Sequence, residues 1–200
     1  MAEIKPRYEF RAFAQHFGMV ETKLRRLAKC EQIRESAEIY LISRANSTNN
    51  TKIRDGKMDI KVFVEKREGL EQWNPRMKGE FPMQTEVLKK EVFPAFGAVE
   101  PVFRREAYSL EQYLDEIIFP HPQLAAVHVF KLRFAFTVNG CITEIAHLLI
   151  NGAAIQTVAV EHTDIAAILK AKEMLGLGEY ENVNYLRAIK RIIGFEPLPA

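Results

Sequence analysis

Asp55-Gly56 lies between two runs of residues in which polar and apolar side chains alternate. An Asp-Gly pair in this setting is a strong short-range signal for a β-hairpin with a two-residue turn. Because successive side chains of a strand point to opposite faces, each run presents one charged face and one apolar face. The charged face holds Lys52, Arg54, Lys57, Asp59 and Lys61, and the apolar face holds Thr51, Ile53, Met58, Ile60, Val62 and Val64. For this hairpin alone, an ordinary solvated outer face is the simpler interpretation.

The same alternation returns in other segments of the chain. Residues 5–14 place Arg7, Glu9 and Arg11 on one face and aromatic residues on the other. Further strands are expected at 32–43, at 101–108 with Arg104, and along a meander from 124 to 161 whose turns are Asn139-Gly140 and Asn151-Gly152. Within this meander, Lys131 and Arg133 share a face, and Glu144 and Glu161 lie on the two later strands.

Helices and one long loop separate the expected strands. Helical spacing predicts helices at 19–29, 83–93, 109–118, 163–175 and 184–193. Ser109 with Gln112 forms a capping-box pattern, and Thr163 is the expected N-cap of the fourth helix. Residues 65–81 are irregular and predict a long loop.

Composition limits the class of protein. The chain has 200 residues and a net charge of +2. So small a charge produces no strong overall positive field that would attract nucleic acid. Two cysteines without a CxxC pattern exclude a disulfide framework and a cysteine zinc site. No apolar run reaches the length of a membrane helix and the N-terminus is not a signal peptide, so we expect no membrane association and a cytoplasmic location. One domain spanning 1–200 is expected.

Together the strands predict a closed barrel. About eight strands suffice to enclose a small lumen. If the charged faces point inward, the lumen holds Arg7, Glu9, Arg11, Lys52, Arg54, Lys61, Arg104, Lys131 and Arg133. Buried bases need an anionic partner, and a polyphosphate suits lysine and arginine. Carboxylates among the bases would hold Mg²⁺ or Mn²⁺ against the phosphates.

Several of these segments resemble the CYTH superfamily of triphosphate tunnel metalloenzymes, which includes thiamine triphosphatases, class IV adenylyl cyclases and inorganic triphosphatases. The superfamily opens with an E-x-E-x-K strand, to which Arg7-Tyr8-Glu9-Phe10-Arg11 is similar. The segments around Lys52-Ile53-Arg54, Asp59-Ile60-Lys61 and Lys131-Leu132-Arg133 resemble its basic strands. Thr157 to Glu161 resembles its terminal strand, which ends in a metal-site glutamate.

This resemblance implies an α+β fold: a closed eight-stranded antiparallel tunnel barrel with a basic interior and helices packed outside. It implies a hydrolase that uses Mg²⁺ or Mn²⁺ to act on a nucleoside triphosphate, thiamine triphosphate or tripolyphosphate. The implied catalytic residues are Glu9 and Glu161, and the implied metal ligands are Glu9, Glu144 and Glu161. The implied phosphate-binding residues are Arg11, Lys52, Arg54, Lys61, Arg104, Lys131 and Arg133.

The chain departs from the motif at Arg7, where the superfamily has its first glutamate. This substitution removes one expected metal ligand and adds positive charge. Three alternatives therefore stay open: a non-catalytic module that binds a polyphosphate or nucleotide, an adenylyl cyclase, and single-strand nucleic-acid binding on an open sheet. The last is disfavoured because the aromatic and basic residues alternate onto opposite faces. A homodimer is compatible with all of these.

Overall fold

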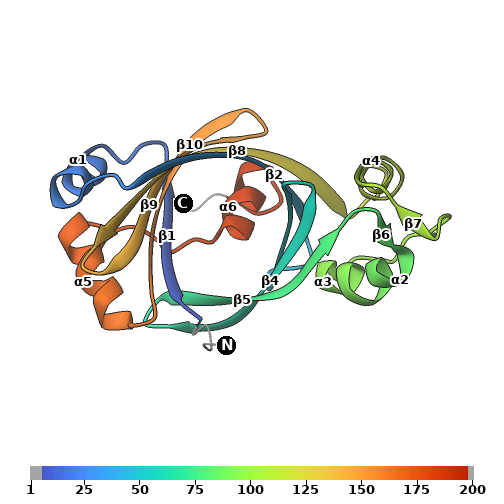
Figure 1. Ribbon diagram of the computed structural model, residues 1–200, viewed down its shortest axis with the longest axis horizontal. Helices are drawn as coiled ribbons and strands as arrows, with labels where there is room; N and C mark the ends of the chain where they lie inside the picture. Colours follow the sequence, from blue (N-terminus) through green and yellow to red (C-terminus); the bar gives the residue numbers. More distant parts are fainter. Residues whose placement is uncertain (1–5, 198–200) are drawn as a thin grey trace. The chain divides into compact units, whose positions relative to one another are not determined.

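The computed structural model describes residues 6–197. In this part of the chain, eight strands close into a barrel in the order β1-β10-β9-β8-β2-β3-β4-β5 (Figure 1). The predicted fold class, an α+β chain built on a closed eight-stranded antiparallel barrel, is confirmed. The barrel strands are β1 (Tyr8–Ala14), β2 (Gln32–Ser43), β3 (Asn49–Arg54), β4 (Lys57–Arg67), β5 (Leu70–Glu80), β8 (Leu124–Val138), β9 (Cys141–Ile150) and β10 (Ala153–His162).

The central hairpin has the predicted register. Lys52 pairs with Asp59, Ile53 with Met58, and Arg54 with Lys57. Both turn residues have positive φ angles, 52° for Asp55 and 70° for Gly56. This is the conformation that makes Asp-Gly favourable in two-residue turns, because glycine adopts it without a Cβ penalty.

The segment predicted as a long loop, 65–81, is instead mostly strand. β4 runs on to Arg67, a turn at Glu68-Gly69 follows, and β5 begins at Leu70. The turn has the same left-handed geometry as the other hairpin turns, with φ angles of 50° and 79°. The loop prediction was wrong because Trp73-Asn74-Pro75 interrupts the alternation that marks the other strands.

The strand predicted at 101–108 is also corrected. Only Ala107–Tyr108 is extended there, as β7, and it pairs with β6 (Met83–Gln84) in a separate two-stranded sheet. Arg104 therefore lies on no barrel strand.

Helices occur near every predicted position. They are α1 (Gly18–Leu27), α2 (Thr85–Val87), α3 (Phe93–Phe96), α4 (Leu110–Tyr113), α5 (Ile165–Leu175) and α6 (Tyr185–Ile192), with π-helical turns at Leu88–Val92 and Leu114–Ile118. The predicted Ser109–Gln112 capping box is present. The N-cap of α5 is Asp164 rather than Thr163, and its carboxylate accepts the backbone N–H of Ala166 at 2.9 Å.

The described residues form two compact units. Unit 1 comprises 6–36, 64–74 and 130–184, and unit 2 comprises 37–63, 75–129 and 185–197. Several barrel strands contribute residues to both units. The prediction of one domain spanning 1–200 stays a prediction.

In unit 1, the apolar face of the sheet packs under two helices. Phe10 of β1 and Val158 of β10 belong to one buried cluster with Leu24 of α1 and Ile168 of α5. All four are 0% exposed. Burial of such side chains is the main favourable contribution to folding. The charged side chains of the same strands consequently lie on the opposite face.

In unit 2, the apolar face packs against the helices between β6 and β8. Ile53 and Met58 of the central hairpin join Phe93 and Tyr113 in a second cluster. Helix α6 lies on the other face, because Tyr185 stacks on Tyr40 of β2 with ring centroids 5.5 Å apart. The polar face of unit 2 is therefore partly covered by a helix.

Across residues 6–197, every helix is too short or too polar to cross a lipid bilayer.

Two leucines of α1 test the packing of unit 1. Leu24 is 0% exposed whereas Leu27 is 46% exposed. We expect Leu24→Ala to lower the free energy of unfolding by about 3 kcal/mol, because it removes buried methyl groups and leaves a cavity. Leu27→Ala, the matched control on the same helix, should change it by less than about 1 kcal/mol. Urea unfolding of both variants gives the comparison, and equal effects would contradict the assigned burial of α1.

Candidate functional site

In unit 1, cross-strand pairing brings the predicted acidic residues onto neighbouring strands. Glu9 of β1 lies directly opposite Glu161 of β10. Arg11 lies opposite Ala159, and Ala159 lies opposite Glu144 of β9. Side chains two strands apart are too distant to meet across a large residue, but alanine leaves the space open. Arg11 can therefore reach Glu144 over Ala159.

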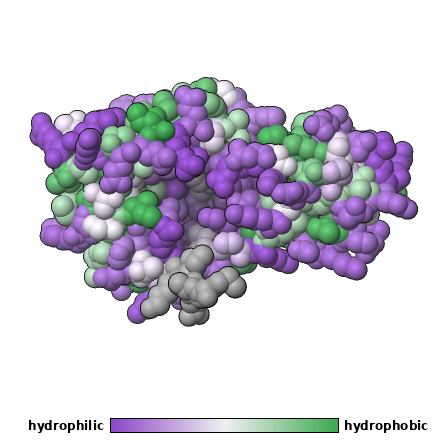
Figure 2. All heavy atoms as spheres, viewed as in Figure 1, coloured by the Kyte–Doolittle hydropathy of each residue, from purple (hydrophilic) through white to green (hydrophobic). Residues whose placement is uncertain are grey.

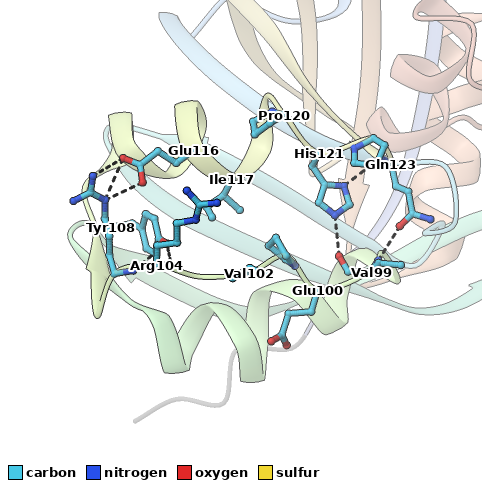
Figure 3. A pocket seen from close by; sticks show the side chains of 13 residues that line it. Val99, Glu100, Val102, Arg104, Tyr108, Glu116, Ile117, Pro120, His121 and Gln123 are labelled. Carbon is cyan, nitrogen blue, oxygen red and sulfur yellow. Dashed lines mark hydrogen bonds and ion pairs between the residues drawn. The ribbon is translucent and has the colours of Figure 1, made fainter.

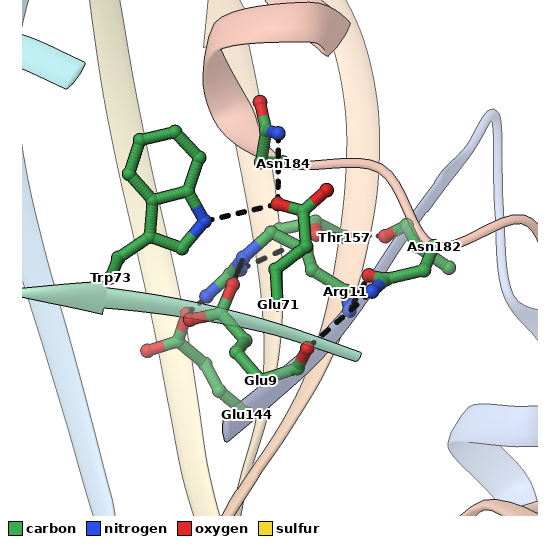
Figure 4. Close-up of polar contacts among 9 residues, drawn as sticks. Glu9, Arg11, Glu71, Trp73, Glu144, Thr157, Asn182 and Asn184 are labelled. Atoms are coloured by element: carbon green, nitrogen blue, oxygen red, sulfur yellow. Dashed lines mark hydrogen bonds and ion pairs between the residues drawn. The ribbon is translucent and has the colours of Figure 1, made fainter. Parts of the chain in front are cut away.

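Arg11 is the centre of this polar face (Figure 4). Its side chain is 7% exposed. The Nε group donates to Glu9 Oε1 at 2.6 Å, and one terminal nitrogen lies 3.7 Å from Glu144 Oε1 and 3.4 Å from Thr157 Oγ1. A guanidinium cannot lose its charge in a protein, so the two carboxylates offset the cost of burying it. The predicted residues Glu9, Arg11 and Glu144 thus form one cluster, which we call the Arg11 cluster.

Four further residues adjoin the Arg11 cluster, and the sequence did not reveal their part in it. Glu71 of β5 lies opposite Glu9, and its Oε2 accepts from Trp73 Nε1 at 3.0 Å and from Asn184 Nδ2 at 2.9 Å. Asn182 Oδ1 accepts the backbone N–H of Arg11 at 2.8 Å. Both asparagines lie between α5 and α6. Asn182 was in no predicted element, Asn184 began the predicted helix 184–193, and Glu71 and Trp73 fell in the segment misassigned as a loop.

Glu161 has a different partner. Its carboxylate lies 4.0 Å from Arg7, the residue that replaces the first motif glutamate. Among the described residues, no group of three or more His, Cys, Asp or Glu side chains is placed to hold a metal ion. The predicted ligands Glu9, Glu144 and Glu161 are oxygen donors of the kind Mg²⁺ prefers, but each has an arginine beside it. They do not form a ready-made metal centre.

The two predicted bases of β8 share the polar face of unit 1. Lys131 is 3% exposed. Arg133 donates from one terminal nitrogen to Ser36 Oγ at 3.2 Å. The Nε atom of Arg133 is buried without an acceptor in the described part of the chain. A buried donor in this state is costly unless a ligand or water accepts from it.

The polar face of unit 2 has its own buried carboxylate. Glu38 of β2 has a fully buried side chain that accepts from Lys52 Nζ at 3.0 Å and lies 3.8 Å from Arg54. Burial lowers the pKa of Lys52 from its ordinary value, and the Glu38 carboxylate counteracts this shift. Glu38 thus keeps an ammonium group charged in a largely desolvated place.

Asp59, which lies opposite Lys52, is a second acid on this face. It is 7% exposed, and its Oδ1 has no hydrogen-bond partner in the described residues. Lys61 is exposed. Glu38 and Asp59 offset much of the positive charge of the bases, and unit 1 likewise carries carboxylates beside its bases. The predicted basic interior, with a few carboxylates among its bases, is therefore not shown.

Arg104 lies outside the barrel strands that form the polar face of unit 2. It belongs to the segment before β7, where Tyr108 fixes its backbone N–H at 2.8 Å. Its placement on a barrel strand was wrong, and its part in phosphate binding stays a prediction.

No protein-family profile and no curated protein sequence matches the chain. Solved structures do match it. A proposed adenylyl cyclase from Hippeastrum, described as having a dominant triphosphatase activity, is 12% identical with a TM-score of 0.51, and the match covers 96% of this chain and 98% of that one. A proposed adenylate cyclase from Bacillus halodurans is 8% identical with a TM-score of 0.52, covering 90% and 95%. The PH1012 protein from Pyrococcus horikoshii is 16% identical with a TM-score of 0.51, covering 90% and 97%.

The chain has the fold of these proteins. Because the matches extend over nearly the whole of each chain, the shared part includes the barrel rather than a fragment of it. Two of the three are described as adenylyl cyclases, an activity of the superfamily that the sequence resembles. The resemblance to the CYTH superfamily is confirmed as a likeness of fold.

The Glu38–Lys52 pair can be tested by removing the carboxylate. We expect Glu38→Gln to lower the pKa of Lys52 further, because burial and the charge of Arg54, which both lower it, are then opposed only by Asp59. We also expect a loss of about 3 kcal/mol in the free energy of unfolding near neutral pH, since a buried ammonium loses its partner. A lysine whose folded-state pKa is lowered destabilises the fold while it is charged in the folded state. The free energy of unfolding should therefore rise as pH increases from the folded pKa to the ordinary lysine pKa.

Chemical unfolding at several pH values and an NMR titration of Lys52 measure both effects. Glu86→Gln is the control, because Glu86 forms a surface pair with Lys90 in which both side chains are more than half exposed. The control should cost less than about 0.5 kcal/mol. An unchanged Lys52 pKa in Glu38→Gln would contradict the assigned pair.

Proposed function

We propose that the protein binds an organic or inorganic triphosphate on the polar faces of its barrel strands and hydrolyses the terminal phosphate. The observation that carries the proposal is the set of buried cationic donors on unit 1, in a fold shared with a protein described as a triphosphatase. Phosphate oxygens are acceptors for such donors, and arginine binds them in a bidentate manner.

On unit 1, Arg11, Lys131 and Arg133 are the proposed phosphate-binding residues. The unsatisfied Nε of Arg133 supports this role, because a phosphate oxygen would supply the acceptor that the described residues lack. Arg11 is already fixed by Glu9 and Glu144, so its guanidinium would meet the ligand without losing further side-chain freedom.

On unit 2, taken by itself, Lys52, Arg54 and Lys61 are proposed to contact phosphate oxygens. Glu38 holds the first two in place on β3. A carboxylate beside a phosphate-binding lysine weakens its attraction for an anion, but it preserves the charge of the lysine. The exposed Lys61 has no such constraint and would adapt to the ligand.

Mg²⁺ or Mn²⁺ is proposed to arrive with the triphosphate, held mainly by phosphate oxygens and by one or two of Glu9, Glu144 and Glu161. Mg²⁺ commonly binds through one or two carboxylates together with phosphates and water. When bound, the metal would neutralise charge on the phosphate oxygens.

The chain's own residues would complete the reaction. Arg11, Lys131 and Arg133 would stabilise the charge that develops on the terminal phosphate as water attacks it. Glu9 and Glu161, which lie opposite each other, are the proposed catalytic residues and would orient the attacking water. The leaving group takes a proton from solvent.

A second candidate is a module that binds the triphosphate without hydrolysing it. The pairing of Arg7 with Glu161 favours it, because this pair places a cation beside a proposed catalytic carboxylate. The third alternative is an adenylyl cyclase, which would bind the triphosphate of ATP through the same residues.

Binding is tested with tripolyphosphate. We expect it to raise the melting temperature more than sulfate does at equal ionic strength, because a ligand that binds only the folded state stabilises it. Arg133→Gln should lower the affinity for tripolyphosphate by about tenfold, since it removes a charge-assisted hydrogen bond. Arg26→Gln, which changes an exposed arginine of α1, is the control. Calorimetric titration with and without EDTA gives the affinities, and absence of saturable binding in both conditions would refute the proposal.

Hydrolysis is tested at Glu161. We expect wild-type protein to release phosphate from a triphosphate with Mg²⁺ or Mn²⁺. Glu161→Gln should abolish release yet keep the affinity within about tenfold, roughly 1.4 kcal/mol. The control is Glu173→Gln on α5, whose side chain is 72% exposed. Phosphate release and cyclic AMP formation are followed in the same samples. Tight binding by wild type with no product of either kind would establish the binding module instead.

A further inference from the structure

Unit 2 contains an open cleft outside the barrel strands, with a volume of about 1180 Å³ (Figure 3). It lies between the segment 99–105 and the turns that follow α4. Its apolar lining consists of Val99, Pro101, Val102, Ile117, Pro120 and Pro122. Small-molecule sites are typically clefts of about 300–1,000 Å³ lined mainly by apolar side chains with a few polar groups. This cleft is somewhat larger than that range, and six of its thirteen lining residues are apolar while the others are polar or charged.

One end of the segment 99–105 is fixed by side chains that bond to its backbone. His121 Nε2 lies 2.8 Å from the carbonyl oxygen of Val99, and Gln123 Oε1 accepts the backbone N–H of Val99 at 2.8 Å. His121 is in turn held by the backbone N–H of Gln123, which donates to its Nδ1 at 3.1 Å. His121 is 9% exposed, so this end is a packed part of the fold.

The other end is fixed by Tyr108. Its hydroxyl oxygen accepts the backbone N–H groups of Arg104 and Arg105 at 2.8 and 3.3 Å, and its side chain is 1% exposed. Thr85 Oγ1 donates to the carbonyl oxygen of Arg105 at 2.6 Å. The wall of the cleft is therefore anchored at both ends rather than being a free loop.

The anchored wall nevertheless exposes apolar side chains. Val99 is 70% exposed and Val102 is 81% exposed. In the space-filling view, apolar surface occurs among polar side chains over the region of α2 to α4 (Figure 2).

The cleft also contains Arg104, a cation that forms no salt bridge with the described residues, although its charge contributes with Arg105 to lowering the pKa of Glu116. Arg105 is held by Glu116, with nitrogen–oxygen distances of 2.7 to 3.1 Å, and this pairing lowers the pKa of the Glu116 carboxyl. Arg104 has no carboxylate within 4.0 Å in the described residues, and Figure 3 shows its guanidinium beside Ile117 in the cleft. Glu100 also lines the cleft, and it forms no ion pair with Arg104 within 4.0 Å.

We propose that this cleft binds a small amphipathic organic anion, with its carboxylate on Arg104 and its apolar body against Val99, Val102 and Ile117. A guanidinium pairs with a carboxylate through two parallel hydrogen bonds, which fixes the orientation of the ligand. The apolar lining contributes affinity in proportion to the area that it buries. The ligand differs from a triphosphate, because the cleft offers one unpaired cation rather than several.

The probes are octanoate, its uncharged analogue octan-1-ol, and 1-naphthoate, followed by NMR chemical-shift mapping and calorimetry. We expect octanoate or 1-naphthoate to give saturable shifts at residues 99–123. Arg104→Gln should lower the affinity for the carboxylate probes by at least about tenfold. It should change the affinity for octan-1-ol by no more than about twofold. Val102→Asp should weaken both classes of probe. Arg26→Gln is the matched control for lost positive charge. Arg104 and Val102 are exposed, so both substitutions should leave the fold intact.

Two results would overturn the proposal. In the first, neither carboxylate produces saturable shifts at 99–123. In the second, Arg104→Gln weakens octanoate no more than it weakens octan-1-ol, which would show that the charge of the ligand is not recognised.

Discussion

Arg11 has a side chain that is 7% exposed, and its guanidinium stays charged at any ordinary pH. Burying such a group costs several kcal/mol unless carboxylates and hydrogen-bond acceptors surround it. Glu9, Glu144 and Thr157 meet this requirement from three neighbouring strands, so the register of β1, β10 and β9 and the charge of Arg11 depend on each other. A slip of one residue would place the guanidinium under α1 and α5, on the apolar face. The polar cluster therefore specifies the pairing as much as the apolar cluster does.

Unit 2 also contains a buried charge surrounded by opposite charges, but here the buried group is an anion. There the fully buried group is the carboxylate of Glu38, and Lys52 and Arg54 surround it. In unit 1 the opposite charges lie on the same strand and two strands away, whereas in unit 2 they lie on the adjacent strand. These polar faces are arranged as internal ion pairs, so their bases are matched by carboxylates more closely than in the predicted interior, which held only a few carboxylates.

The alternation of side chains was enough to predict the barrel strands and the register of the central hairpin. Three turns of the barrel were marked by Asp55-Gly56, Asn139-Gly140 and Asn151-Gly152, because few residues other than glycine, asparagine and aspartate tolerate positive φ angles. Glu68-Gly69 adopts the same geometry but was missed, since glutamate is not a typical residue at that position. The strand predicted around Arg104 failed for the opposite reason: alternation over a few residues is also compatible with an irregular segment held by side-chain contacts.

The members of the candidate site were partly predictable, but their pairing was not. Residue type and strand parity identified Glu9, Arg11 and Glu144. The contact between Arg11 and Glu144 depends on Ala159, a small residue on the intervening strand, and local periodicity carries no information about such a gap. Asn182 and Asn184 reach β1 and Glu71 from a segment far along the chain. Asn182 belongs to no periodic pattern, and the helical pattern that begins at Asn184 carries no information about the partner of that residue.

The ion pairs within these polar faces affect how strongly a phosphate ligand can bind there. An anion that approaches Arg11 meets a cation already neutralised by Glu9 and Glu144, so its binding energy is reduced by the repulsion of those carboxylates. A metal ion that accompanies the phosphate would reverse this effect, because the same carboxylates would then attract it. Arg133, whose Nε lacks an acceptor among the described residues, has no such opposing carboxylate within ion-pair distance in that part of the chain. On unit 1, the first phosphate oxygen is therefore expected at Arg133, and the contact with Arg11 is expected to form only when a cation enters beside Glu9 and Glu144.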